Sequence, residues 1–174
     1  MRKFLKIFAG HKGCLMNKVY LLTGGNLGHP QAVLQAAKEA IARQCGPVVA
    51  ASSVYRTAAW GKEDQPDFLN QVLLVHTALD SFSLLQTVQQ IELQAGRQRV
   101  EKYGPRLLDI DILLFNNDII DTPRLQLPHQ QMANRRFVLV PLAEIAPQVV
   151  HPVTGQTILQ LLKQCPDTLA VHKL

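Results

Sequence analysis

The chain has 174 residues, of which 47% are hydrophobic and 18% are charged. This composition supplies apolar side chains for one folded domain and argues against intrinsic disorder. No apolar run approaches the roughly 20 residues of a membrane-spanning helix, so we expect a soluble protein. The formal net charge is +5, but four positive side chains lie within the first sixteen residues. The rest of the chain has little excess charge with which to attract a nucleic acid.

Residues 1–16 form a basic segment that we expect to be either a disordered extension outside the folded domain or an over-long start. Lysine and histidine interrupt its apolar positions and no clean cleavage site follows, so it does not fit a signal peptide. Because apolar side chains alternate with lysine there, a short membrane-surface helix is the alternative, although one short segment anchors weakly. We therefore expect a single domain over residues 17–174 without a membrane partner.

The three cysteines, Cys14, Cys45 and Cys165, are odd in number and far apart in the sequence. They contain no CxxC pair, so a disulfide framework and a zinc site are both disfavoured. We expect them to be small buried side chains of a protein in a reducing compartment, the cytoplasm.

Strand-like and helix-like segments alternate from Lys18 onward. The predicted elements are a strand at 19–22, a glycine-rich turn at 24–28, a helix from Pro30 to Gly46, strands at 48–57 and 68–79, a helix capped by Ser81 and ending at Gly96, a strand at 107–115, an apolar stretch at 137–145 and a helix at 157–164. A polar loop is expected at 58–66. This order indicates one α+β domain with an antiparallel or mixed sheet covered by helices.

Asp109 and Asp111 interrupt an otherwise apolar strand. Alternation places Leu108, Ile110, Ile112 and Leu114 on one face and both aspartates on the other. Two neighbouring carboxylates repel each other, and burying them without a cation is costly, so Mg²⁺ is a natural partner. An edge strand with two solvated aspartates is the alternative, and the pair taken alone fits that alternative better.

A basic loop directly precedes the aspartates. Its cations are Arg97, Arg99, Lys102 and Arg106, and glycines bound it at Gly96 and Gly104. Basic groups that face a metal-binding carboxylate pair are typical of a polyphosphate site, and the glycines would let the loop close over substrate. Alternatively, the arginines only neutralise the aspartates in a structural network. The common nucleotide-binding motifs are absent from the sequence, as is any pairing that suggests covalent catalysis.

Four segments, in order along the chain, resemble the 6-hydroxymethyl-7,8-dihydropterin pyrophosphokinase family. They are LLTGGNLG at 21–28, SSVYRT with DQPDFLN between 52 and 70, GRQRVEKYGPRLLDIDILLF at 96–115, and LPHQQMANRRFVLVPLAEIAP at 127–147. The resemblance implies a ferredoxin-like α+β sandwich. It also implies an enzyme of folate biosynthesis that transfers the β,γ-diphosphate of ATP to the pterin hydroxymethyl oxygen and releases AMP.

The resemblance assigns a role to particular residues. It implies that Asp109 and Asp111 hold two Mg²⁺ ions and act with Arg97 and Arg106 as the catalytic set. The implied ATP-binding residues are Glu92, Arg97, Arg106, His129 and Arg135. The implied pterin-binding residues are Thr57, Ala58, Trp60, Phe68, Asn70 and Phe137, among which Asn70 hydrogen-bonds the ring edge and the two phenylalanines sandwich the ring.

Three departures from the family pattern, at Gly25, at Ala58–Trp60 and at Tyr103, leave the implied metal ligands and phosphate arginines in place. We therefore expect an active, monomeric enzyme whose partners are ATP and a dihydropterin. Two other functions stay open at this point. One is a ferredoxin-like nucleic-acid-binding module, which the basic cluster beside two aspartates disfavours. The other is a catalytically silent relative, which loss of an aspartate or of Arg97 would favour.

Overall fold

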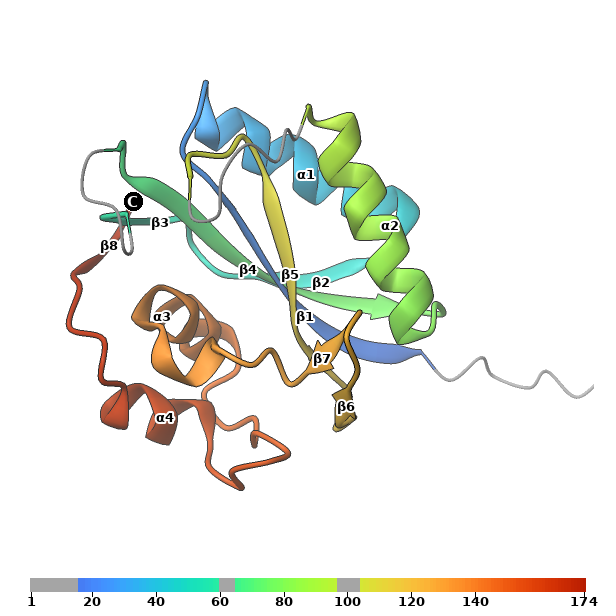
Figure 1. Ribbon diagram of the computed structural model, residues 1–174, viewed down its shortest axis with the longest axis vertical. Coiled ribbons are helices and arrows are strands. Elements are labelled where there is room, and N and C mark those ends of the chain that lie inside the picture. The colour runs from blue at the N-terminus through green and yellow to red at the C-terminus, as the bar shows by residue number, and fades with distance from the viewer. Residues whose placement is uncertain (1–15, 60–64, 97–103) are drawn as a thin grey trace, which may run out of the picture.

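The computed structural model describes residues 16–59, 65–96 and 104–174. In these ranges six strands form one sheet in the order β5-β1-β4-β3-β8, with β2 also pairing with β4, and every pairing is antiparallel (Figure 1). The strands are β1 (Asn17–Gly25), β2 (Val48–Ala51), β3 (Tyr55–Thr57), β4 (Phe68–Thr77), β5 (Asp109–Phe115) and β8 (Val171–Lys173). A small separate hairpin pairs β6 (Ile120–Asp121) with β7 (Gln126–Leu127).

Helices cover both faces of the sheet (Figure 1). One face packs against α1 (Pro30–Gln44) and α2 (Ser81–Gln94), and the other packs against α3 (Arg136–Ile145) and α4 (Ile158–Gln164). A short 3₁₀ helix, η1 (Met132–Asn134), precedes α3. We call the side that packs against α3 and α4 the α3 face, and the opposite side the α1 face. No helix in the described ranges has the length and apolar character needed to cross a membrane.

Strands β1, β4 and β5 contribute to a hydrophobic core on both sides of the sheet because successive side chains point to opposite faces. In β1, Leu21 packs into the core under α1 and α2, whereas Leu22 packs into the core under α3 and α4. In β4, Leu73 faces the α1 face and Val72 faces the α3 face. Asn70, two residues before Val72, therefore also lies on the α3 face.

The strict alternation expected along β5 breaks near its end. Tyr20 pairs with Leu114 and Leu21 pairs with Ile112, so Leu113 is an extra residue in β5. This bulge puts both Leu113 and Leu114 into the core of the α3 face, and the expectation that Leu114 shares a face with Ile112 was wrong. Asp109 and Asp111 precede the bulge, so the expectation that they share one face is confirmed.

The expected helices and strands are confirmed with several changes at their boundaries. Asp80, not Ser81, caps α2, because its carboxylate accepts the backbone N–H groups of Phe82 and Ser83 at 2.9 Å each. The expected strand at 48–57 is two strands, and the apolar stretch at 137–145 forms helix α3. Strand β8 was not predicted. Its three residues carry no alternation that distinguishes them from a loop.

Candidate functional site

One row across the sheet brings together residues that are far apart in the sequence. Gly24 of β1 pairs with Asp109 of β5 on one side and with Asn70 of β4 on the other. All three positions belong to the α3 face. Two strand spacings place Asp109 and Asn70 roughly 10 Å apart, with only the glycine backbone between them.

The Asn70 amide has a defined orientation. Its Nδ2 donates a hydrogen bond of 3.0 Å to Oγ1 of Thr57, and both side chains are buried. A Cβ atom on Gly24 would lie 2.7 Å from Oδ1 of Asn70, so the amide occupies the space that any larger residue there would fill. Phe68 lies two residues before Asn70 on β4 and pairs with Thr57 of β3, and Phe68 is half-buried. Thus β3 and β4 place three of the predicted pterin-binding residues together, and exposed Ala58 follows directly after Thr57.

The two aspartates of β5 lie in an electrically mixed environment. Loss of hydration raises the pKa of Asp111 above its ordinary value, and the neighbouring charge of Asp109 raises it further. Nearby His129, Arg135 and Arg106 act in the opposite direction. Four other predicted residues, from β5, from the turn before it and from the segment before α3, therefore lie close enough to act on the Asp111 carboxylate.

Arg106 contacts the aspartate pair directly. Its Nη1 donates to Oδ2 of Asp109 at 2.5 Å. For this arginine the structure contains the neutralising ion pair that was the alternative to phosphate binding. A charge-assisted pair at the edge of a site can exchange for a phosphate when substrate arrives, so the contact is compatible with both functions.

The aspartate pair fits a divalent cation. It supplies oxygen ligands, and a bound cation would offset the burial and the neighbouring Asp109 charge that raise the pKa of Asp111. Among the described residues, no group of three or more His, Cys, Asp or Glu side chains is placed to hold a metal ion. Mg²⁺ typically binds through one or two carboxylates and completes its coordination with water and substrate phosphates, which is the donor set available here.

Asn26 anchors the turns that surround the aspartates, and the sequence interpretation overlooked it. Its backbone N–H donates to the Arg106 carbonyl, and its Oδ1 accepts the Arg106 backbone N–H, both at 2.9 Å. Its Nδ2 donates to the Pro66 carbonyl at 3.0 Å. The preceding residue, Gly25, approaches so closely that a Cβ atom would lie 2.3 Å from the Leu107 carbonyl oxygen. In the sequence, the GGN segment at residues 24–26 is the signal for this role, because a buried asparagine in a turn belongs to no periodic pattern.

Glu92 lies on α2 and is 2% exposed. Its Oε1 accepts the backbone N–H of Ile110 at 2.7 Å, on the free edge of β5. The residue thus attaches α2 to the strand between the two aspartates. Its predicted contact with ATP stays a prediction.

The segment before α3 contributes two predicted residues, His129 and Arg135, and the first turn of α3 contributes Phe137. His129 donates its backbone N–H to the Leu113 carbonyl at 2.9 Å, and its Nδ1 accepts the Gln131 N–H at 3.2 Å. In the neutral ring the proton therefore resides on Nε2. The Arg135 guanidinium carbon lies 5.8 Å from the centre of the Phe137 ring, a cation–π arrangement at the start of α3. Predicted residues Arg97 and Trp60 lie outside the described residues, as do Arg99, Lys102 and Tyr103.

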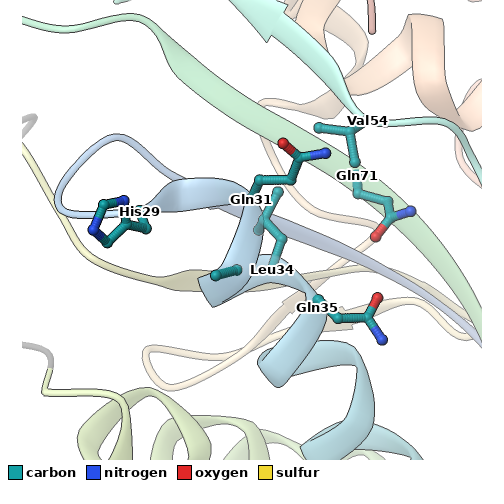
Figure 2. A pocket seen from close by; sticks show the side chains of 7 residues that line it. His29, Gln31, Leu34, Gln35, Val54 and Gln71 are labelled. Atoms are coloured by element: carbon teal, nitrogen blue, oxygen red, sulfur yellow. The ribbon is translucent and has the colours of Figure 1, made fainter.

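A pocket of about 620 Å³ is lined by other residues (Figure 2). Its lining consists of His29, Gln31, Ala32, Leu34, Gln35, Val54 and Gln71. Leu34 belongs to the core of the α1 face, and Gln71 follows Asn70 on β4 and so points to the opposite side of the sheet. The pocket is therefore separate from the site on the α3 face.

Comparisons with known proteins identify similar sequences. Residues 20–147 match the family described as 7,8-dihydro-6-hydroxymethylpterin-pyrophosphokinase (HPPK). The chain is 43% identical over 160 residues to the 2-amino-4-hydroxy-6-hydroxymethyldihydropteridine pyrophosphokinase of Haemophilus influenzae, covering 91% of this chain and 97% of the relative. It is 42% identical over 153 residues to the protein of the same name from Pseudomonas aeruginosa, covering 87% and 94%.

Solved structures agree at the level of the fold. The chain is similar to Plasmodium falciparum HPPK-DHPS with pteroate, with a TM-score of 0.71 at 16% identity. It is similar to the wild-type protein with STZ-DHP, with a TM-score of 0.67 at 17% identity. The alignments cover 86% of this chain and 42% and 41% of those longer chains, so this chain spans about two fifths of their length. HPPK domains have the ferredoxin-like fold, and the expected ferredoxin-like sandwich is confirmed.

Proposed function

The chain belongs to the 7,8-dihydro-6-hydroxymethylpterin-pyrophosphokinase family, and we propose that its α3 face carries the transfer of diphosphate from ATP to 6-hydroxymethyl-7,8-dihydropterin. The protein is an ATP-dependent diphosphotransferase of folate biosynthesis. The observation that supports this location is the row Asp109, Gly24, Asn70. It sets a carboxylate suited to a divalent cation roughly 10 Å from an amide suited to a pterin edge.

The ATP end of the site lies over β5. Asp109 and Asp111 would hold two Mg²⁺ ions, which when bound neutralise phosphate charge and favour in-line attack on the β-phosphorus. Arg106 and Arg97 would bind phosphate oxygens, Arg106 by exchanging its bond with Asp109 for a bond with ATP. His129 would donate from Nε2, the nitrogen left protonated by its contact with Gln131. Arg135 and Glu92 complete the proposed ATP-binding set.

The pterin end of the site lies over β3 and β4. Asn70, held by Thr57, would hydrogen-bond the polar edge of the ring. Phe68 and Phe137 are both half-buried, so each has ring surface available for stacking on the two faces of the pterin. The Ala58 backbone and Trp60 would complete the contacts. Positioning of the hydroxymethyl group beside the β-phosphorus would provide much of the rate acceleration.

The reaction tests the proposal most directly through its nucleotide product. With ATP, Mg²⁺ and 6-hydroxymethyl-7,8-dihydropterin, we expect AMP to be released in a pterin-dependent manner. Replacement of Asp111 by Asn keeps the side-chain volume and removes a charge, and should lower the rate about 10²- to 10³-fold. Release is measured by chromatographic separation of AMP from ADP.

The control for this experiment is Asp118→Asn, which removes a carboxylate from an exposed turn after the same strand. We expect its rate to equal that of the unmodified protein. Formation of ADP, or AMP release that does not depend on the pterin, would contradict the proposed reaction. An Asp111→Asn variant with full activity would contradict the proposed metal ligands.

We also propose that residues 17–174 act as one monomeric domain in the cytoplasm, with ATP and the dihydropterin as partners. Cys45 and Cys165 are free thiols, which supports a reducing compartment. Light scattering on the purified chain, with and without both substrates, tests the oligomeric state.

A further inference from the structure

The C-terminal end of the chain contacts α3 at both ends of that helix. In Figure 1 it runs in red from α4 past α3 to β8. Asp167 contacts the beginning of α3 and Lys173 contacts Glu144 near its end. We refer to residues 166–174 as the C-terminal strap.

Asp167 completes the N-terminus of α3. The residue at the N-cap position is Arg135, whose guanidinium has donors but no acceptor and so cannot cap backbone N–H groups. Oδ2 of Asp167 accepts the Arg136 N–H at 2.8 Å, while Oδ1 accepts the Leu169 N–H at 3.0 Å and fixes the carboxylate. A negative charge at a helix N-terminus is also favourable for the helix dipole.

Glu144 joins the other end of α3 to the sheet edge. Its carboxylate accepts the backbone N–H and the hydroxyl of Ser53 at 2.8 and 3.0 Å, the Tyr55 hydroxyl at 3.0 Å and the Lys173 ammonium at 2.7 Å. Strand β8 then pairs with β3, and the Leu174 N–H donates to the Val54 carbonyl at 3.0 Å. One carboxylate therefore couples α3, β3 and the strap.

These contacts involve α3 and β3, two elements that also carry residues of the proposed pterin site. The start of α3 carries Phe137 and follows Arg135, and β3 carries Thr57, which holds Asn70. A change in the separation of α3 from β3 would change the width of the space between Phe137 and Asn70. The strap contacts both elements and so can determine that width.

We infer that the C-terminal strap, through Asp167 and the Glu144–Lys173 pair, positions α3 against β3 and thereby sets the affinity for the pterin. Asp167, Glu144 and Lys173 are positioning residues in this inference, because they act through Arg135, Phe137 and Thr57. The inference rests on the proposed pterin site.

The first test separates positioning from simple stability. We expect Asp167→Ala to raise KM for the pterin about three- to tenfold, which is the fold-change equivalent to the free energy of a lost helix cap. We expect kcat to stay within about twofold of its value in the unmodified protein. Asp167→Asn keeps one acceptor for the Arg136 N–H and should recover most of the affinity. The matched control is Asp80→Ala, which removes the α2 cap at the far end of the sheet. It should lower Tm and leave KM unchanged.

The second test addresses the other end of α3. Lys173→Met keeps the aliphatic stem and removes the ion pair, and should raise KM for the pterin about two- to threefold. Salt near 1 M should remove this difference by weakening the pair in the unmodified chain. Lys163→Met on α4, an exposed lysine as well, is the control and should leave KM unchanged.

The outcomes distinguish the positioning role of the strap from the proposed function. A fully active unmodified protein, combined with an Asp167→Ala variant that has lower Tm and unchanged KM, would overturn the positioning role and leave the proposed function standing. Failure of Asp167→Asn to recover affinity would also overturn it. Absence of pterin-dependent AMP from the folded, unmodified chain would overturn both the proposed function and the inference.

Discussion

Gly24 has no side chain at the point where β1 passes between Asp109 and Asn70. Packing, and not an unusual backbone conformation, accounts for the glycine at this position. A Cβ atom there would lie 2.7 Å from Oδ1 of Asn70. The bare backbone also keeps the path open between the proposed phosphate end and the proposed pterin end. In the proposed site, the absence of a side chain here would let Asp109 on β5 and Asn70 on β4 act on one pair of substrates.

Replacement of Gly24 by alanine should therefore act through Asn70. The added methyl group pushes the amide away and breaks its bond to Thr57, at a cost of about 1–3 kcal/mol in unfolding free energy. We expect KM for the pterin to rise about tenfold and KM for ATP to change much less. Steady-state kinetics with each substrate varied in turn measures both constants.

A double-mutant cycle checks the cause of this effect. In an Asn70→Ala background the methyl group no longer meets an amide, so Gly24→Ala should change KM for the pterin little further. Equal effects of Gly24→Ala in both backgrounds would show that the glycine acts independently of Asn70.

At the scale of elements, β5 is an edge strand that carries both aspartates, and α2 protects its free edge. Glu92 does this by accepting the Ile110 N–H, a charge-assisted bond in a buried place. The same bond fixes the backbone between Asp109 and Asp111. Helix α2, which carries neither aspartate, therefore helps to fix the positions of both.

Removal of the Glu92 side chain should destabilise the protein strongly. Glu92→Ala leaves the Ile110 N–H buried without this acceptor and creates a cavity, and we expect a loss of about 2–4 kcal/mol in unfolding free energy. Glu92→Gln keeps an acceptor oxygen and should lose less than half of that. Urea unfolding followed by far-UV circular dichroism measures both values.

Comparison of the two variants also tests the predicted ATP role of Glu92. If Glu92→Gln folds normally and keeps its KM for ATP, the residue is structural and the predicted contact is wrong. Equal destabilisation by Gln and by Ala would instead contradict the acceptor role at Ile110.

At the scale of the whole molecule, one sheet separates two chemically different sides. The predicted residues of the described ranges, apart from Glu92 on α2, lie on the α3 face or on the segments that border it, whereas the pocket of Figure 2 belongs to the α1 face. Both helical layers share the same strands, so we expect them to unfold as one cooperative unit. A titrating group in any layer should then shift the stability of the entire chain.

We expect His151 to cause such a shift in mildly acid solution. It is buried, and its Nδ1 accepts the N–H groups of Val153 and Thr154 at 3.3 Å, which requires an unprotonated nitrogen. Burial lowers its pKa below the ordinary value of 6.5. Between the two pKa values the unfolded chain binds more protons, so this contribution to stability is present above pH 6.5 and is lost as the pH falls through the folded pKa.

We therefore expect Tm to decrease between about pH 6.5 and pH 5. His151→Asn offers an amide oxygen in place of Nδ1 and cannot titrate, so its Tm should vary less with pH over this interval. Differential scanning calorimetry across the interval measures the difference. Parallel curves for the two proteins would rule out His151 as the source of the dependence.

Local patterns in the sequence predict much of the secondary structure and the chemistry of the candidate residues. The period of two places Asp109 and Asp111 on one face of a strand, and the spacing of apolar residues identifies α1 and α2. These features depend on residues a few positions apart in the sequence, so the spacing of apolar and polar residues is enough to predict them. The four family segments supplied the remaining assignments.

The contacts between residues that are distant in the sequence follow from the tertiary fold. The bulge at Leu113, the pairing of β8 with β3 and the row from Asp109 through Gly24 to Asn70 depend on contacts between distant segments. Asn26 reaches Arg106, 80 positions away. No local periodicity encodes these contacts, because they form when the two cores pack against opposite faces of one sheet and fix the register of its strands.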